Sequence, residues 1–210
     1  MRRLLLLTGI LILPAMWFGP IAKLGQQAFF VHMIVHMVVV AVAAPLMACG
    51  LAGGRFDPVR RFPAVFLPVP ASMIEFLVVW AWHVPHLHHL ARHSPAGLIA
   101  EQGMFLVSGL YLWLSAVGGD SLQRTNRTGA GVLGLLLTAM HMTLLGVLIA
   151  LAPRPLYPHS AGFAGLSPLD DQHLGGAIMI LMGGIVYVGG GLCLMARLLQ
   201  TRSLKPGGPQ

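Results

Sequence analysis

The sequence predicts an all-α fold, a polytopic bundle of about six transmembrane helices in a single domain. Three observations lead to this prediction. The chain of 210 residues is 56% hydrophobic and only 9% charged, with a mean hydropathy of +0.78. Several of its apolar runs approach or exceed the roughly 20 residues that are needed to cross a bilayer. Finally, the basic residues are concentrated in the short segments that separate these runs.

The boundaries of the runs are marked by helix-breaking and charged residues. The first run follows Arg2 and Arg3 and is typical of a cleaved signal peptide or of a first transmembrane helix; Lys23, soon after it, and the lack of a small-residue cleavage site favour the helix. Glycine pairs or prolines follow the second, fourth and fifth runs. The expected spans are residues 4–20, 27–51, 63–83, 97–117, 130–152 and 174–199, in one domain of residues 1–200 with a basic tail at 201–210.

The distribution of Arg and Lys predicts the orientation of the bundle. Six spans place both termini on one side of the membrane, together with ten of the 13 basic residues. The other side carries only Lys23, Arg92 and Arg154. Because cytoplasmic loops are enriched in basic residues, both termini should be cytoplasmic. The net charge of +7 therefore reflects membrane topology, and we expect a lipid bilayer rather than nucleic acid as the surrounding partner.

The histidines are distributed just as unevenly. With this orientation, none of the ten histidines is expected in a cytoplasmic loop. A hydrophilic outer rim that happens to use histidine is one interpretation, and an outward-facing metal site is the other. The candidates within or at the ends of spans are His32, His36, His83 and His141, and those in outer loops are His86, His88, His89, His93, His159 and His173.

The second span contains the best pair of candidate ligands. His32 and His36 are four residues apart, so they share one face of a helix. Met33 and Met37 share the adjacent face, about 100° further round. Imidazole and thioether are both ligands for a soft or borderline metal such as copper. The alternative is that both imidazoles are neutral and hydrogen-bonded to neighbouring helices.

Two further spans offer imidazoles. His83 follows two tryptophans, and Pro85 should end its helix at the outer membrane boundary. It could bind metal there or only cap the helix within an aromatic belt. In the fifth span, three consecutive residues fan over about 200°, so they cannot all face one site. We expect His141 to face inward with either Met140 or Met142 beside it, unless both methionines serve only in packing.

Acidic and glycine residues of the spans add structural expectations. Glu75 lies well inside a span, so it must face protein or water; it could support a ligand histidine, relay protons or be protonated. Asp170 and Asp171 precede the sixth span and could cap its helix or bind metal. In that span glycine recurs every seven residues, which predicts a stripe where a neighbouring helix approaches closely: Gly176, Gly183 and Gly190, with Gly184 and Gly191 beside it.

Taken together, these motifs make the chain resemble the CtaG family of cytochrome c oxidase assembly proteins, membrane proteins associated with copper insertion into haem-copper oxidases. The resemblance rests on four stretches, which follow one another in the family's order. They are HMIVHMVVVAVAAPLMACG (32–50), WAWHVPHLHHLA (80–91), MHMTLLGVLIALAPRPLYP (140–158) and GLSPLDDQHLGGAIM (165–179). It implies an oxidase subunit as partner, other copper chaperones as possible partners, and a bacterial inner (plasma) membrane protein whose histidine-rich side faces the periplasm.

The chain departs from the family's pattern at the start of the fourth span. The pattern has a histidine there, with Glu-His three and four residues on, whereas this chain has Leu98, Glu101 and Gln102. Glu101 is therefore the acid that the resemblance retains. The missing histidines leave two possibilities, a site with fewer ligands or one that uses histidines of the outer segment, His86, His88, His89 or His93.

Three functions follow from these residues. The leading hypothesis is a non-enzymatic assembly factor that holds copper, as Cu(I), at the outer face of the membrane and passes it to the oxidase. The alternatives are a b-type haem protein, with His36 and either His141 or His83 as axial ligands, and a metal-free scaffold for oxidase assembly. An enzyme is disfavoured because the sequence offers no nucleophile–base–acid constellation. The expected metal ligands are His32, His36, His83 and His141 with Met33, Met37, Met140 and Met142, supported by Glu75, Glu101 and Asp171.

Overall fold

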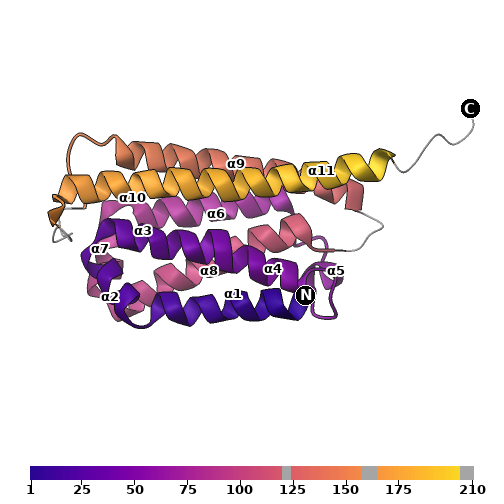
Figure 1. Cartoon of the computed structure of the whole chain (residues 1–210), viewed down its shortest axis with the longest axis horizontal. Helices are drawn as coiled ribbons and strands as arrows, with labels where there is room; N and C mark the ends of the chain where they lie inside the picture. Colours follow the sequence, from indigo (N-terminus) through magenta and orange to yellow (C-terminus); the bar gives the residue numbers. More distant parts are fainter. Residues whose placement is uncertain (120–123, 158–164, 204–210) are drawn as a thin grey trace, which may run out of the picture.

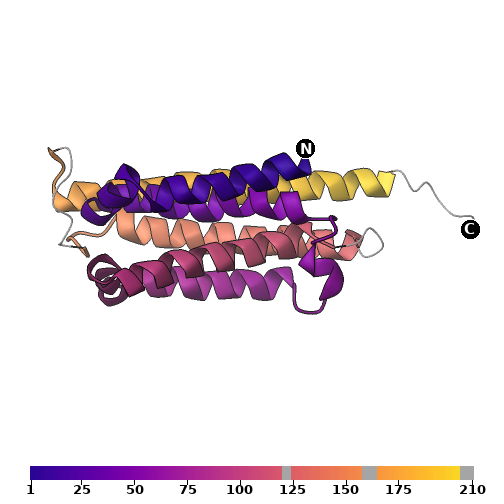
Figure 2. The ribbon, with the colours of Figure 1, turned by 90° about the horizontal axis from the view of Figure 1, so that it is seen from below.

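The computed structural model describes residues 1–119, 124–157 and 165–203. Every regular element within these ranges is helical, and the long helices lie side by side along one axis (Figures 1 and 2). The elements are α1 (Arg2–Trp17), α2 (Pro20–Gln27), α3 (Phe29–Val38), the π-helical turn η1 (Val39–Ala43), α4 (Ala44–Leu51), α5 (Pro58–Arg61), α6 (Pro68–His83), α7 (Pro85–His93), α8 (Pro95–Val117), α9 (Arg124–Ala150), α10 (Pro168–Gly183), the π-helical turn η4 (Gly184–Val188) and α11 (Gly189–Ser203).

The all-α membrane fold that the sequence predicts is confirmed, but the number of spans is confirmed only in part. In the described ranges, four segments are long and apolar enough to cross a membrane: Phe29–Leu51, Pro95–Val117, Arg127–Ala150 and Pro168–Gln200. The bent pair α1 and α2, at 55°, gives a fifth. The remaining expected span corresponds to α6, which has only 16 residues. At 1.5 Å per residue, α6 is about 24 Å long, shorter than a hydrocarbon core of about 30 Å.

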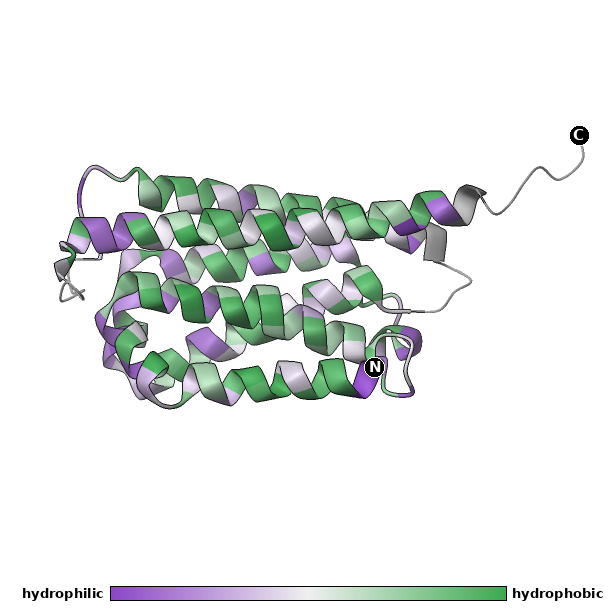
Figure 3. Cartoon of the chain, in the orientation of Figure 1, coloured by the Kyte–Doolittle hydropathy of each residue, from purple (hydrophilic) through white to green (hydrophobic). Residues whose placement is uncertain are grey.

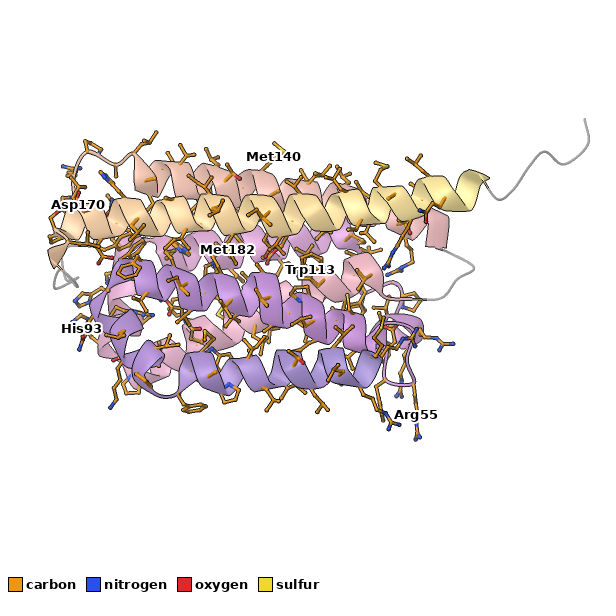
Figure 4. All side chains as sticks on the ribbon, viewed as in Figure 1. Arg55, His93, Trp113, Met140, Asp170 and Met182 are labelled. Carbon is orange, nitrogen blue, oxygen red and sulfur yellow. The ribbon has the colours of Figure 1, made fainter. Side chains whose placement is uncertain are left out.

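Polar residues gather at the two ends of the bundle, while apolar residues cover its length (Figure 3). Helix α1 begins and α11 ends near the same end, where Arg55 also lies. His93 and Asp170 lie at the opposite end (Figure 4). The segment after His83, expected to be a loop, is the helix α7 at this second end. We refer to it below as the histidine-rich end, since α7 contributes His86, His88, His89 and His93.

The second span changes helix type where it meets Pro45. Proline has no N–H, and its ring crowds the carbonyl four residues earlier, here Ala41. The chain responds with η1, in which the Ala44 N–H donates to the Val39 carbonyl, five residues back. The carbonyl of Val40 then accepts from the Trp113 indole at 3.2 Å. The wide turn begins only after Val38, so the histidine pair lies in the regular helix α3.

The start of α3 is fixed by an acid from another helix. None of the residues of α3 or its N-cap supplies a side-chain cap. Instead, the buried carboxylate of Asp171 in α10 accepts from the backbone N–H groups of Phe29 and Phe30, both at 2.8 Å. A negative charge at a helix N-terminus is favourable. The expectation that Asp170 or Asp171 caps α10 is corrected, because Ser167 caps that helix.

The glycine stripe of α10 and α11 is confirmed on one side. A Cβ atom on Gly176 would lie 2.6 Å from the Ala150 nitrogen of α9, and one on Gly190 would lie 2.7 Å from the Trp113 ring. By contrast, a Cβ atom on Gly184 would meet open space. The stripe therefore lets α10 and α11 approach α9 and α8 closely, which positions Asp171 against α3.

Replacement of Asp171 by Ala should lower the free energy of unfolding in detergent by about 2 kcal/mol, because two N–H groups lose a charged acceptor. Thermal unfolding followed by circular dichroism measures the change. The control is Asp170→Ala, which removes an exposed carboxylate from the preceding position. Equal destabilisation by the two substitutions would contradict the role assigned to Asp171.

Candidate metal site

Four imidazoles come together near the histidine-rich end, from α3, α6 and α7. Ring centroids lie 5.4 Å apart for His36 and His83, 6.5 Å for His32 and His83, and 5.0 Å for His32 and His88. All four side chains are buried. We call these residues, His32, His36, His83 and His88, the buried histidine cluster. The sequence predicts His32, His36 and His83 as ligands, and it offers His88 only as an alternative.

His36 and His83 are the members whose lone pairs point to metal binding. His83 Nδ1 lies 2.6 Å from the Val79 carbonyl, which can only accept, so Nδ1 carries the proton and the lone pair is on Nε2. Neither this Nε2 nor either nitrogen of His36 has a hydrogen-bond partner among the described residues. Buried polar atoms are normally satisfied, so unsatisfied ones suggest a binding role. A neutral imidazole is the form that ligates metals.

His32 faces a different environment, because a cation already lies beside it. Arg92 of α7 donates to His32 Nδ1 at 3.0 Å and to the Gly25 carbonyl at 3.1 Å, and it forms an ion pair with Glu101 of α8. Arginine has no acceptor, so His32 Nδ1 must accept and Nε2 must carry the proton. His32 therefore has no spare lone pair while Arg92 is in place.

The Glu101 carboxylate completes this polar group. It is fully buried, accepts from the Gln102 side-chain amide at 3.2 Å, and lies 3.7 Å from His32 Nε2. Potential ligand atoms of His32, His88 and Glu101 all lie within 4.8 Å of one another, a spacing that suits a metal. However, the guanidinium of Arg92 already neutralises Glu101, and it would repel a second cation. His36 and His83 are therefore the stronger candidate ligands.

His88 connects the cluster to the outer segment α7. Burial holds its pKa well below the usual range for histidine, and the positive charge of the neighbouring Arg92 acts in the same direction. His88 is accordingly neutral near pH 7, and its Nδ1 has no hydrogen-bond partner in the part of the chain that the structure describes. Burial also lowers the pKa of Arg92, whereas the charge of Glu101 raises it.

The predicted methionine ligands lie on a different interface. Met33, Met37 and Met142 are fully buried. Their contacts near glycines of α10 are short: a Cβ atom on Gly175 would lie 3.0 Å from Met33 Cγ, and one on Gly183 would lie 3.3 Å from Met142 Cβ and 3.9 Å from Met37 Cε. The methionines of α3 therefore pack toward α10, while its histidines face α6, α7 and α8.

The fifth span does not bring its histidine to the cluster. His141 packs edge-on against Phe76 at 5.3 Å, and no ring contact joins it to another imidazole among the described residues. Met140 is 68% exposed and points away from the bundle (Figure 4). His141 and Met142 are buried, as expected for a helix that turns one of its two methionines inward, but no ring contact joins His141 to the histidines of α3 among the described residues. His159 lies outside the described residues.

The buried acid Glu75 is engaged by hydroxyl groups of neighbouring helices. Glu75 accepts from the Tyr187 hydroxyl at 3.0 Å and from the Thr138 hydroxyl at 3.3 Å. Thr138 also shares a hydrogen bond with Ser72 at 2.9 Å. Glu75 thus joins α6, α9 and η4. Of the three acids expected to support ligands, only Glu101 lies beside a histidine of the cluster.

Two pockets flank Arg92. The outer pocket, of about 410 Å³, opens beside α7 and is lined by His86, His88, His89, His93 and Tyr157, among others. The second pocket, of about 460 Å³, is mainly apolar, and its lining includes Leu98 and Gln102. Gly25 and Arg92 line both pockets. The two positions where the family's histidines are missing thus face an apolar pocket, and Gln102 there accepts from the Trp17 indole at 3.1 Å.

Comparison with known proteins identifies the family. The profile of the cytochrome c oxidase caa3 assembly factor family (Caa3_CtaG) matches residues 1–201. The chain belongs to this family. No curated protein and no solved structure matches it. The resemblance noted from the four stretches is confirmed, and the chain is an integral membrane protein of cytochrome c oxidase assembly.

Sequence reasoning missed one residue of this assembly factor's site. The charge distribution names Arg92 only as one of three basic residues on the outer side of the membrane, and it assigns Arg92 no role in a site. The useful signal was its spacing: Arg92 follows His88 by four residues, so both occupy one face of α7. That face is directed inward, toward His32 and Glu101.

Single replacement of Arg92 or Glu101 by Gln should each lower the free energy of unfolding by about 3–5 kcal/mol, because each leaves a buried charge without its partner. The double variant should lose clearly less than the sum of the two. Thermal or denaturant unfolding in detergent measures this double-mutant cycle. Additive losses would show that Arg92 and Glu101 do not act as a pair.

Proposed function

We propose that this assembly factor holds copper, as Cu(I), in the buried histidine cluster and delivers it to a subunit of a haem-copper oxidase at the outer face of the membrane. One observation carries the proposal. The lone pairs of His36 and of His83 Nε2 are buried and unpartnered among the described residues, on rings 5.4 Å apart. A modest rotation of either ring would let both bind one ion, as first-shell metal–nitrogen bonds are about 2 Å long.

The surroundings of these two rings favour a singly charged ion. His36 packs against the Phe105 ring at a centroid distance of 4.1 Å, and both histidines are shielded from solvent. Desolvation of a doubly charged ion in such a site would cost far more than that of Cu(I). Copper also suits imidazole ligands. Neither cysteine belongs to the cluster, so no thiolate holds the metal back from an acceptor site.

The outer pocket offers the route by which copper would enter and leave. His88 lines this pocket and also packs against His32, which in turn neighbours His83. Ring centroids along this series are 5.0, 6.5 and 5.4 Å apart, ending at His36. Transfer along this series would move copper between the pocket and the buried site once Arg92 withdraws from His32 Nδ1, because that contact occupies the lone pair of the ring. The role is that of a carrier, with copper chaperones as donors and no catalytic step.

A metal-free scaffold is the second candidate, and Arg92 is the observation that favours it. In its ion pair with Glu101, Arg92 neutralises the buried carboxylate near His32 without any metal. A b-type haem is less compatible with the geometry. The His36 and His83 rings lie too close together, and Phe105 too close to His36, for a porphyrin to fit between them.

Purified protein should bind about one Cu(I) per chain under reducing conditions, as a two-imidazole site allows. Joint replacement of His36 and His83 by Leu should abolish this binding while the protein keeps its helical spectrum. A competition titration with a chromogenic Cu(I) chelator measures the stoichiometry.

The matched control for that titration is His141→Leu, which removes a buried histidine outside the cluster. This variant should bind copper like the wild type. Unchanged binding in the His36/His83 variant, or an equal loss in the His141 variant, would reject the ligand assignment. Full oxidase assembly by a variant that binds no copper would favour the scaffold.

The outward orientation of the histidine-rich end has its own test. In a background where Cys49 and Cys193 are replaced by Ser, His86→Cys should react with a membrane-impermeant maleimide in intact cells. Arg55→Cys, at the opposite end, should react only after permeabilisation, because the positive-inside rule places it in the cytoplasm. The reverse labelling pattern would overturn the proposed orientation.

A further inference from the structure

Helix α7 carries a second pair of histidines, outside the buried cluster. His89 and His93 are four residues apart and exposed, and they line the outer pocket. Their rings are stacked, with centroids 3.9 Å apart and planes at 18°. His93 Nδ1 lies 2.9 Å from the His89 carbonyl, which can only accept. The lone pair of His93 is therefore on Nε2, the atom at the tip of the side chain.

The backbone beneath this pair is held in place by the buried side of α7. His88 packs against His32, and Arg92 is fixed by Glu101 and by the Gly25 carbonyl. His89 and His93 are the next residues along, about 100° further round the helix, so they face the pocket while His88 and Arg92 face the interior. A chelating pair on a rigid element needs little reorganisation to bind an ion.

We propose that His89 and His93 chelate a divalent transition-metal ion at the mouth of the outer pocket, forming a metal site separate from the buried cluster. Two histidines at positions i and i+4 of a helix are a known chelating arrangement for such ions. The exposed position leaves coordination positions open to water, so a double charge remains solvated. Imidazole ligands without thiolate favour borderline ions, and Cu²⁺ is bound most tightly among the divalent first-row metals.

The two metal sites differ in what they select. The outer pair is wet and open, which suits Cu(II) or, more weakly, Zn(II). The buried cluster is dry and lies behind Arg92, which lines the outer pocket and contacts His32. The outer pair does not depend on the proposed function, since it can bind a divalent ion whether or not the cluster takes up Cu(I).

The test is Cu(II) binding to the full-length protein in detergent, followed by electron paramagnetic resonance with competition by a weak chelator. The wild type should show one Cu(II) with nitrogen hyperfine structure from two imidazoles. His89→Ala and His93→Ala should each weaken binding about tenfold or more. The control is His86→Ala, which removes another exposed histidine from the same helix and pocket and should leave affinity unchanged.

Circular dichroism checks that each variant keeps the wild-type helix content. If an Ala variant loses helix content, the same histidine is replaced by Gln instead. Cu(II) affinity that is unchanged in both His89 and His93 variants, or lowered equally in the His86 variant, would overturn the proposal. The His36/His83 double variant separates the two sites. It should keep the Cu(II) signal, and loss of that signal there would place Cu(II) in the buried cluster instead.

Discussion

Polar groups inside a membrane bundle must find their partners within the protein, and this constraint organises the interior of the assembly factor. Three of the four buried acids among the described residues lie in long helices, and each meets this constraint in a different way. Asp171 caps α3, Glu75 accepts from two hydroxyl groups, and Glu101 pairs with Arg92. Several buried imidazoles, including His141, keep nitrogens without a hydrogen-bond partner among the described residues. His36 and His83 differ from His141 in that their rings lie next to each other, 5.4 Å apart.

These contacts also position the histidines. Asp171 ties the start of α3 to α10, and the Tyr157 hydroxyl donates to the His83 carbonyl at 2.7 Å, which holds the end of α6. Arg92 then joins α7 to α8 and to the chain before α3 through Glu101 and Gly25. Three helices that bear imidazoles are thus held together by polar contacts at one end. Apolar side chains pack along the length of the bundle, and polar contacts at one end fix the positions of the histidines.

Hydropathy was sufficient to predict the helical membrane fold, because long apolar runs have few other stable arrangements. It overestimated α6, whose first expected residues, from Pro63 onward, precede the helix that begins at Pro68. It also missed that α7 is helical, since a short polar segment resembles a loop in hydropathy alone. The turn at η1 follows from Pro45, but sequence patterns do not say whether a proline bends, breaks or widens a helix.

The site was harder to predict, because spacing reveals which residues share a face but not what that face meets. The 100° offset between the histidines and methionines of α3 was visible in the sequence, and the structure directs the two faces to different neighbours. His141 met the same criteria as His36, and each ring packs against a phenylalanine, but among the described residues only His36 has an imidazole neighbour. Arg92 contributes through long-range contacts with Glu101 and His32, and only tertiary structure brings these residues together.

In the proposed function, imidazole nitrogens of the buried cluster hold the copper. X-ray absorption spectroscopy of the wild-type protein loaded with Cu(I) tests this assignment, because the spectrum reports the atoms bonded to the metal. We expect a nitrogen shell at about 2 Å with the outer-shell scattering of histidine rings and no sulfur ligand. A first shell dominated by sulfur would place copper on methionine or cysteine and contradict the claim.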